Sequence, residues 1–252
     1  MVRGLFSAGS AMLVFSGRQD LLANDLANAA TPGYRTEVAP VAAFPEMLIH
    51  RELRTVRTPR GLAGTGAYIE RSYTRWDPAP ARYTGRNLDL AIEGDGFFVV
   101  QSAAGPRLTR AGNFTIGSDG VLVTQDGLPV LGLDGPVRTG RVTDGEIAVT
   151  QEGAVMTEDG RFLGQILVVD VPDRQGLVRE GSNLFRYTAE SGGPVRVDAR
   201  VQQGMLEGSG TSVIGTMVEM IAGMRAYQAA QQAVRAHDQM TEALIAQLGR
   251  TS

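Results

Sequence analysis

The hydrophobic positions near the start of the chain repeat at alternating intervals of three and four residues. An average interval of about 3.5 residues places side chains in one narrow seam, so the first thirty residues predict a single amphipathic helix. Gln19 falls in the same seam and is its one plainly polar member. The apolar members of this seam are Leu5, Ala8, Met12, Phe15, Leu22, Leu26 and Ala29. A seam this narrow requires a partner helix.

The end of this helix is marked by a turn sequence of four residues, Thr31, Pro32, Gly33 and Tyr34. Proline disfavours helical geometry in the residue before it, and Pro-Gly suits the central positions of a type II turn. We therefore expect the helix to end near Ala29 or Ala30. Gly9 and Gly17 each weaken a helix by about 1 kcal/mol relative to alanine, so we expect neighbouring elements to order it.

The same spacing returns between Val213 and Leu248 and predicts a second helix, about 54 Å long at the usual rise per residue. His237 and Thr241 interrupt its apolar stripe. The stripe consists of Val213, Met217, Met220, Met224, Tyr227, Ala230, Val234, Leu244 and Leu248. Matching periodicity at the two ends predicts that the terminal helices pair as a coiled coil. Because both helices carry few charges, we also expect copies of the chain to cover the pair.

Short apolar or alternating runs between residues 87 and 201 indicate strands. The runs are residues 88–92, 96–100, 121–123, 166–169 and 195–199. Asp-Gly pairs begin at residues 95, 119, 126, 134, 144 and 159 and supply the positive φ values of tight hairpin turns. Calcium ligation would need these carboxylates at fixed offsets, and a glycosidase pair cannot be identified from sequence, so turn chemistry is the better interpretation.

These patterns together predict an α+β fold. Its N- and C-terminal helices pair as a coiled coil, and its central domain is mainly antiparallel β. The expected domains are a terminal helical domain (residues 1–34 and 213–252), an extended basic connecting arm (35–86) and the central β domain (87–212).

The connecting arm is rich in proline, glycine and arginine, and Arg51, Arg54 and Arg57 lie near its middle. Residues 44–53 suggest one short helix beginning at Pro45. Acidic residues gather further along the chain, at Asp144, Glu146, Glu152, Glu158 and Asp159. We expect the arm to dock through its three arginines on this acidic face of an adjacent subunit. Nucleic-acid binding is not favoured, because the arm's aromatics fit a binding sheet only loosely.

Composition excludes several kinds of chemistry. The chain has no cysteine and two histidines, so thiol nucleophiles and multi-histidine metal sites are ruled out. No serine-nucleophile elbow or phosphate-binding loop is present, so we expect no catalytic, metal or cofactor site. A net charge of -3 leaves no global basic field for nucleic acid. We expect neither membrane insertion nor a cleaved signal peptide, since no run of about 18 apolar residues and no Ala-x-Ala site occurs.

Several motifs resemble the axial proteins of the bacterial flagellum. LANDLAN at residues 22–28 and TPGYR at 31–35 are similar to the N-terminal signature of rod and hook subunits. The central block of the basal-body rod proteins is resembled by LDLAIEGDGFF at 88–98, TRAGNF at 109–114 and GLPVLG at 127–132. Its C-terminal half is resembled by GSNLF at 181–185, QGMLE at 203–207, MVEMI at 217–221 and RAY at 225–227. Asp25 and residues 208–212 depart from the usual pattern.

The resemblance implies a structural subunit that is exported unfolded through the flagellar type III apparatus and polymerises into a hollow tube. Its partners would be copies of itself and other rod or hook proteins. In such a tube the terminal helices form the inner layer, which transmits torque and conducts later subunits. The assembly seam would then comprise Leu5, Met12, Phe15, Gln19, Leu22 and Leu26 with Met217, Met220, Met224, Tyr227 and Leu244. The junction would comprise Asn24, Asn28, Thr31, Pro32, Gly33 and Tyr34.

The length leaves two rod paralogues. Gly135 and Pro136 favour the proximal-rod member, whereas residues 225–227 and 238–240 also suit the distal-rod member. A non-flagellar surface β protein with oligomerising tails is the other alternative. The polar Gln19 is a candidate for fixing the register of the helix pair.

Overall fold

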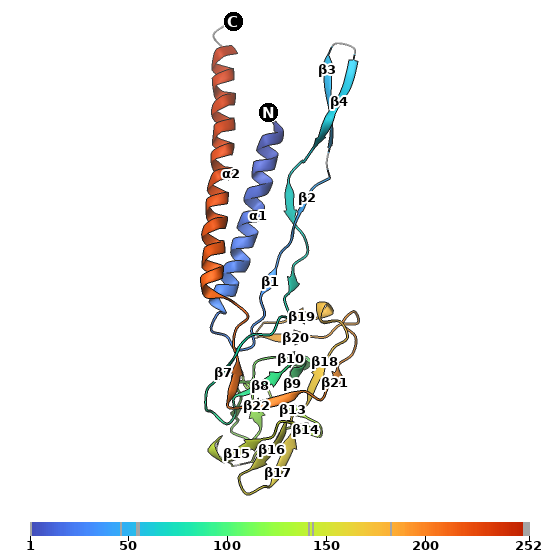
Figure 1. The fold of residues 1–252 in the computed structure, drawn as a ribbon, viewed down its shortest axis with the longest axis vertical. Helices are drawn as coiled ribbons and strands as arrows, with labels where there is room; N and C mark the ends of the chain where they lie inside the picture. Colours follow the sequence, from blue (N-terminus) through green and yellow to red (C-terminus); the bar gives the residue numbers. More distant parts are fainter. Residues whose placement is uncertain are drawn as a thin grey trace. The chain divides into compact units, whose positions relative to one another are not determined.

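The computed structural model describes residues 2–45, 47–53, 56–140, 142, 144–181 and 183–248 (Figure 1). The chain divides into two compact units. The helical unit comprises Met1–Ala27, Glu37–Tyr73 and Val213–Ser252. The β unit comprises Asn28–Thr36 and Thr74–Ser212. The connecting arm expected at residues 35–86 is therefore divided between the two units, because residues 37–73 belong to the helical unit and the rest of the arm belongs to the β unit.

Two helices in contact form most of the helical unit. Helix α1 spans Val2–Ala27 and α2 spans Val213–Leu248, and the two pack along each other (Figure 1). The bounds of α2 are those expected from the apolar spacing. Helix α1 ends slightly before the expected Ala29 or Ala30, because residues 28–30 already form the turn that leads to Pro32.

Short strands complete the helical unit. Strand β2 (Val41–Ala43) pairs antiparallel with β5 (Ala67–Ile69), and the extended hairpin of β3 (Met47–Leu53) and β4 (Val56–Ala63) lies between them in sequence. Two further short strands are β1 (Glu37–Val38) and β6 (Tyr73–Thr74), the latter at the boundary of the units.

The hairpin corrects one prediction, because the expected short helix within residues 44–53 does not form. Residues 47–53 instead pair with residues 56–63, and the register shifts between Ile49 and His50, so that one residue of β4 is left over as a bulge. The pairing partner lies immediately along the chain, and a cross-strand ladder replaces the local hydrogen bonds of a helix. Apolar spacing in so short a segment cannot distinguish the two outcomes.

The β unit is mainly antiparallel and built from many short strands. Its largest sheet has the order β19-β20-β10-β9-β18-β21. Those strands are β9 (Phe97–Ser102), β10 (Gly105–Thr109), β18 (Val168–Asp170), β19 (Val178–Arg179), β20 (Leu184–Arg186) and β21 (Val195–Arg196). A three-stranded sheet consists of β15 (Ile147–Val149), β16 (Ala154–Thr157) and β17 (Phe162–Gln165).

Antiparallel pairs of strands make up the remainder of the β unit. They are β7 (Ala81–Tyr83) with β23 (Met205–Glu207), β8 (Leu90–Glu93) with β22 (Arg200–Gln203), β11 (Thr115–Ile116) with β12 (Leu122–Val123), and β13 (Leu131–Gly132) with β14 (Gly135–Pro136). Two single 3-10 turns are η1 (Asp144–Glu146) and η2 (Arg174–Gly176). Each run of residues predicted as a strand overlaps one of these strands.

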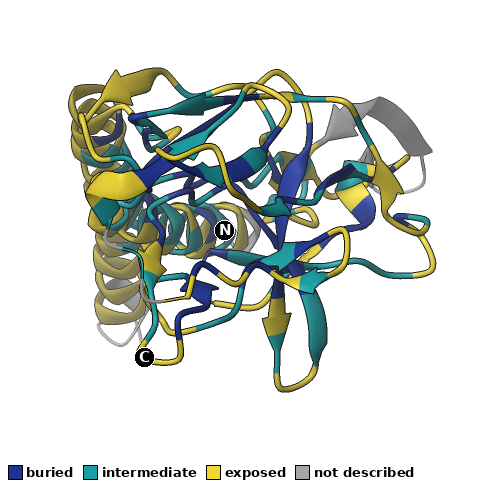
Figure 2. Cartoon of the chain, turned by 90° about the horizontal axis from the view of Figure 1, so that it is seen from below, coloured by how far each residue is buried: buried dark blue, intermediate teal, exposed yellow. Residues whose placement is uncertain are grey.

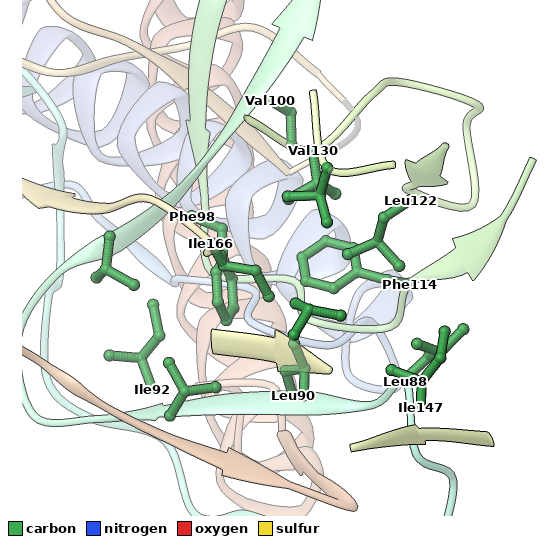
Figure 3. Packing of buried hydrophobic residues seen from close by; sticks show 14 residues of the cluster. Leu88, Leu90, Ile92, Phe98, Val100, Phe114, Leu122, Val130, Ile147 and Ile166 are labelled. Carbon is green, nitrogen blue, oxygen red and sulfur yellow. The ribbon is translucent and has the colours of Figure 1, made fainter. Parts of the chain in front are cut away.

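Two hydrophobic cores lie on the two faces of the main sheet, and β9 contributes to both. Phe98 and Val100 belong to the larger core, whereas Phe97 and Val99 belong to the smaller one. Strand side chains alternate between faces, so the unbroken apolar run of β9 reflects burial on both sides. In the larger core the Phe98 and Phe114 rings meet edge to face, 5.1 Å apart (Figure 3).

The Asp-Gly turns behave as expected at most positions. Asp134-Gly135 closes the β13–β14 hairpin and Asp159-Gly160 lies in the turn between β16 and β17, with φ of 113° and 81° at their glycines. Asp144-Gly145 is different, because it forms part of the 3-10 turn η1.

Burial is concentrated in the β unit, whereas the helices show mainly half-buried and exposed residues (Figure 2).

Candidate functional site

The contact between α1 and α2 includes the polar residue predicted in the seam. Gln19 is half-buried, and its Nε2 donates a hydrogen bond to the Met220 carbonyl across the helices at 2.8 Å. Its Oε1 is buried without a hydrogen-bond partner among the described residues. Phe15, Leu22 and Gly223 line the same groove, which has a volume of about 290 Å³. One polar side chain thus links the two helices at a defined position.

On α2 the contacting stripe differs partly from the predicted one. Seven of its half-buried or buried members follow the three-and-four spacing, and Ala226 and Gln231 are half-buried beside them. The seven are Thr216, Met220, Gly223, Tyr227, Ala230, Val234 and His237. Met220 and Tyr227 thus belong to both stripes, whereas Met217, Met224 and Leu244 are exposed. The apolar spacing missed Thr216, because a small residue can mark close helix approach without being strongly apolar. Gly223, as a glycine, is expected to allow such an approach.

His237, which was expected to interrupt the seam, lies within it. A Cβ atom added to Gly4 would fall 2.6 Å from His237 Nε2, so the imidazole occupies the space beside that glycine.

On α1, the predicted seam residues Met12, Phe15, Leu22 and Leu26 are half-buried, and Leu5 is exposed. The structure therefore brings most of the α1 seam against other elements.

A second face of α1 contacts the strands of its own unit. The Ala67 amide donates a hydrogen bond to Ser10 Oγ at 3.2 Å. Further along the helix, a Cβ atom on Gly17 would fall 2.6 Å from Ile69 Cδ1. Gly17, costly in an isolated helix, thus permits close approach of β5. The apolar spacing gave no signal for this contact, because it depends on small residues.

The helical unit also keeps large apolar side chains exposed. Leu13 on α1 is 76% exposed and Ile214 on α2 is 79% exposed. The further exposed members are Leu5 and Phe6 on α1 and Val213, Met217, Val218, Ile221, Met224, Met240, Leu244 and Ile245 on α2. We call this set the exposed apolar face. Its extent is unusual for scattered surface residues and is typical of a surface that another chain covers.

The predicted junction residues lie in the β unit, except Asn24, which is exposed on α1. The Thr31 amide donates to the Asn28 carbonyl at 3.1 Å, and Thr31 Oγ1 donates to Asn28 Oδ1 at 3.2 Å. The Pro32 carbonyl accepts a hydrogen bond of 2.7 Å from Asn183 Nδ2. Tyr34 is buried. The segment after α1 is thus a folded part of the β unit.

Gly33 is required in this segment for two reasons. Its φ is +65°, which an L side chain rarely adopts, and an added Cβ would fall 2.5 Å from the Arg110 carbonyl carbon. The Gly33 amide donates to the Glu207 carbonyl at 3.0 Å. The glycine therefore allows residues 31–35 to lie directly against two other segments of the β unit.

Three charged residues, one in this segment and two beside it, were given no role by the sequence patterns. Arg35 and Glu207 are buried and form an ion pair of 2.5 Å, and buried Arg110 lies 3.5 Å from the other oxygen of Glu207. Burial lowers the pKa of Arg110 to about 10; the Glu207 carboxylate opposes this shift and the charge of Arg35 adds to it. These residues stand in quoted motifs, but a motif does not show which charges meet.

The arm residues are only partly described. Arg51 lies in β3 and Arg57 in β4, and Arg54 lies outside the described residues. The acidic residues lie around the three-stranded sheet, where the Glu158 amide donates to the Glu146 carbonyl at 2.9 Å. Asp144 lies 3.8 Å from the guanidinium of Arg86.

Two family models match the chain. The model of the flagellar hook protein FlgE/F/G D1 domain matches residues 91–157, in the β unit. The model of the flagellar basal body rod FlgEFG protein C-terminal matches residues 202–248, which end with α2. Both therefore fall on parts of the fold described above.

Known rod proteins are similar over nearly the whole chain. The basal-body rod protein FlgF of Caulobacter vibrioides is 30% identical over 257 residues, covering 99% of each chain. The chain belongs to the flagellar basal-body rod protein family. The rod protein FlgG of Bacillus subtilis is 30% identical, covering 97% of this chain and 98% of that protein. FlgF of Salmonella typhimurium is 31% identical, covering 95% of each chain.

Membership of the rod-protein family makes the chain a structural protein of the flagellar basal body with a role in motility, and not an enzyme. It removes the non-flagellar surface protein as an alternative. In the described part of the chain, neither helix combines the length and apolarity needed to span a membrane.

Proposed function

We propose that this rod protein polymerises through its terminal helices into a hollow helical tube that transmits torque and conducts exported subunits. In the tube α1 and α2 pair as a coiled coil, within an α+β fold, and form the inner layer. The observation that carries the proposal is the exposed apolar face on both helices.

Burial of this face would supply the free energy of assembly. Full burial of one large aliphatic or aromatic side chain contributes about 1.5 to 3 kcal/mol. Leu13, Ile214 and Ile221 lie on the two elements that a tube would bring together from neighbouring copies. We propose that the predicted seam residues Leu5, Met217, Met224 and Leu244, which belong to the exposed apolar face, act at the same contacts.

We also propose that the chain is exported by the flagellar type III apparatus without a cleaved signal peptide and acts in the cell envelope outside the cytoplasmic membrane. It neither inserts into a membrane nor binds nucleic acid. We assign it to the proximal rod, with the distal rod as the alternative. The similar relatives include both FlgF and FlgG at the same 30% identity.

We further propose that the basic arm docks on an adjacent subunit through Arg51, Arg54 and Arg57. Charge complementarity supports this proposal. Glu152, Glu158 and Asp159 are exposed around the three-stranded sheet and carry the opposite charge.

A double variant tests the polymerisation proposal. In I214S/I221S, two exposed apolar residues on α2 become polar. The folded chain should therefore keep nearly all of its stability, whereas the polymer should lose an apolar contact in every subunit. We expect helix content within a tenth of wild type by circular dichroism, and loss of filaments by light scattering and microscopy.

Q232S/Q239S is the matched control, because Gln232 and Gln239 are also exposed on α2 and have the same separation along the helix as the two isoleucines. Both residues are already polar, so the change to serine removes no apolar surface. This variant should assemble like wild type. Filament formation by I214S/I221S at the wild-type concentration, or a closed small oligomer from the wild-type chain, would contradict the proposal.

A further inference from the structure

Four of the quoted motifs meet at one place in the β unit. TPGYR supplies Arg35, TRAGNF supplies Arg110, QGMLE supplies Glu207 and GSNLF supplies Asn183. These residues are far apart in sequence, yet hydrogen bonds or ion pairs connect each of them to residues 31–35 or to Glu207. We call Arg35, Arg110 and Glu207 the buried ion cluster.

Glu207 is the centre of this cluster, because it contacts three separate segments. Its Oε1 accepts a hydrogen bond from Arg35 Nη2 at 2.5 Å and another from the Ala79 amide at 3.2 Å. Its Oε2 faces Arg110 Nη1 at 3.5 Å. Its own carbonyl accepts from the Gly33 amide. With a side chain only 6% exposed, it has little access to water that could replace these partners.

The two arginines extend the contacts outward. Arg35 Nη1 donates to the Asp77 carbonyl at 2.9 Å, and Arg110 Nη2 donates to the Gly94 carbonyl at 2.7 Å. The Arg35 carbonyl accepts from Arg179, whose guanidinium lies 4.8 Å from the centre of the Tyr34 ring. Arg35 is therefore held at its side chain and at its backbone.

The chain segment that leads to α2 is bonded at the same place. The Gly210 amide donates to the Tyr34 carbonyl at 2.9 Å, and the Gly208 amide donates to the Pro80 carbonyl at 3.0 Å. Residues 31–35 follow α1 and residues 207–210 precede α2. Both connections to the helices thus begin beside the Glu207 carboxylate.

Electrostatics makes the carboxylate of Glu207 difficult to replace. Buried charges are tolerated when they are paired and hydrogen-bonded, and removing one partner leaves the others uncompensated. Here one carboxylate serves two buried guanidinium groups. Glutamine would keep the shape and an acceptor oxygen but lose the charge that both arginines require.

We propose that Glu207 is a positioning residue, which holds residues 31–35 and 207–210 in one conformation and so fixes where both helical connections leave the β unit. The inference does not depend on the proposed function, because it concerns the single chain and is tested without assembly.

The test is amide hydrogen exchange on the full-length chain, comparing E207Q with wild type. We expect exchange at Gly33 and Gly210 to become at least tenfold faster, while amides of the central strand β9 keep their wild-type rates. A merely stabilising role would instead accelerate both sets by the same factor. That uniform result, or unchanged exchange at Gly33 and Gly210, would overturn the proposal.

E180Q is the matched control, because Glu180 also pairs with two arginines, Arg107 at 2.6 Å and Arg186 at 2.5 Å. It should leave exchange at Gly33 and Gly210 unchanged. If E207Q does not fold, E207D gives the same test, since it keeps the charge but shortens the reach to Arg110. Its exchange at Gly33 should be faster than wild type, and wild-type exchange in a folded E207D would overturn the proposal.

Discussion

At the scale of single residues, Gln19 shows how one polar side chain among apolar neighbours affects a pair of helices. Its amide forms one hydrogen bond across the helices, to the Met220 carbonyl, and leaves its own oxygen without a described partner. A buried polar group that is half satisfied costs stability, but a single polar position in a helix seam fixes register.

Replacing Gln19 by leucine should therefore have opposite effects on stability and specificity. Q19L should raise the free energy of unfolding by about 1 kcal/mol, since apolar burial and removal of the unpaired oxygen exceed the lost hydrogen bond. It should also multiply the amide signals of α1 in NMR spectra, as alternative registers appear. Q232L, at an exposed position of α2, should do neither. A less stable Q19L with single signals would contradict this view.

At the scale of elements, the repeating patterns of the sequence predicted what depends on local periodicity. The bounds of α2 and the placement of the strands followed from apolar spacing, and the hairpin turns at Gly135 and Gly160 followed from Asp-Gly pairs. Contacts between distant segments could not be predicted in this way. The strand beside Gly17 and the buried ion cluster depend on which distant segments meet in space. The β3–β4 hairpin was missed for another reason, because apolar spacing in so short a segment does not distinguish a strand from a helix.

The two interior glycines of α1 allow the effect of helix propensity on stability to be distinguished from the effect of contacts between distant segments. Nothing lies within 4 Å of a Cβ added at Gly9, whereas at Gly17 it would meet Ile69. G9A should therefore stabilise the chain by up to about 1 kcal/mol, the helix propensity difference. G17A should stabilise the chain less than G9A does, or should destabilise it, because the Ile69 side chain must move.

Urea unfolding of the full chain measures both free energies, and exchange of the Ala67 amide reports on β5. Each glycine serves as the control for the other, because both changes add one methyl group to the same helix. Equal stabilisation by G9A and G17A, with unchanged exchange at Ala67, would show that β5 does not contact α1 closely.

At the scale of the whole molecule, charge is distributed unevenly despite a net charge of only -3. Arginines gather in the arm, and exposed carboxylates gather around the three-stranded sheet of the β unit. In general, opposite charged patches steer the association of proteins and favour particular contacts, and the proposed docking of the arm relies on this effect.

Charge reversal in the arm should therefore impair assembly without affecting folding. R54E/R57E should retain the wild-type unfolding temperature and show reduced motility in soft agar. Adding E158R/D159R, which reverses the proposed docking face, should restore part of that motility. R138E/R196E, at exposed arginines outside the arm, is the control. Normal motility of R54E/R57E would rule out arm docking.

The hydrogen bond between Gly210 and Tyr34 has a consequence for how such chains evolve. It brings together the segment that follows α1 and the segment that precedes α2. A body whose ends are adjacent is topologically an insertion, and proteins tolerate insertions best at such points. A gene could therefore exchange the whole region between the two helices, which includes residues 37–73 of the helical unit, while the codons of both helices remain the same.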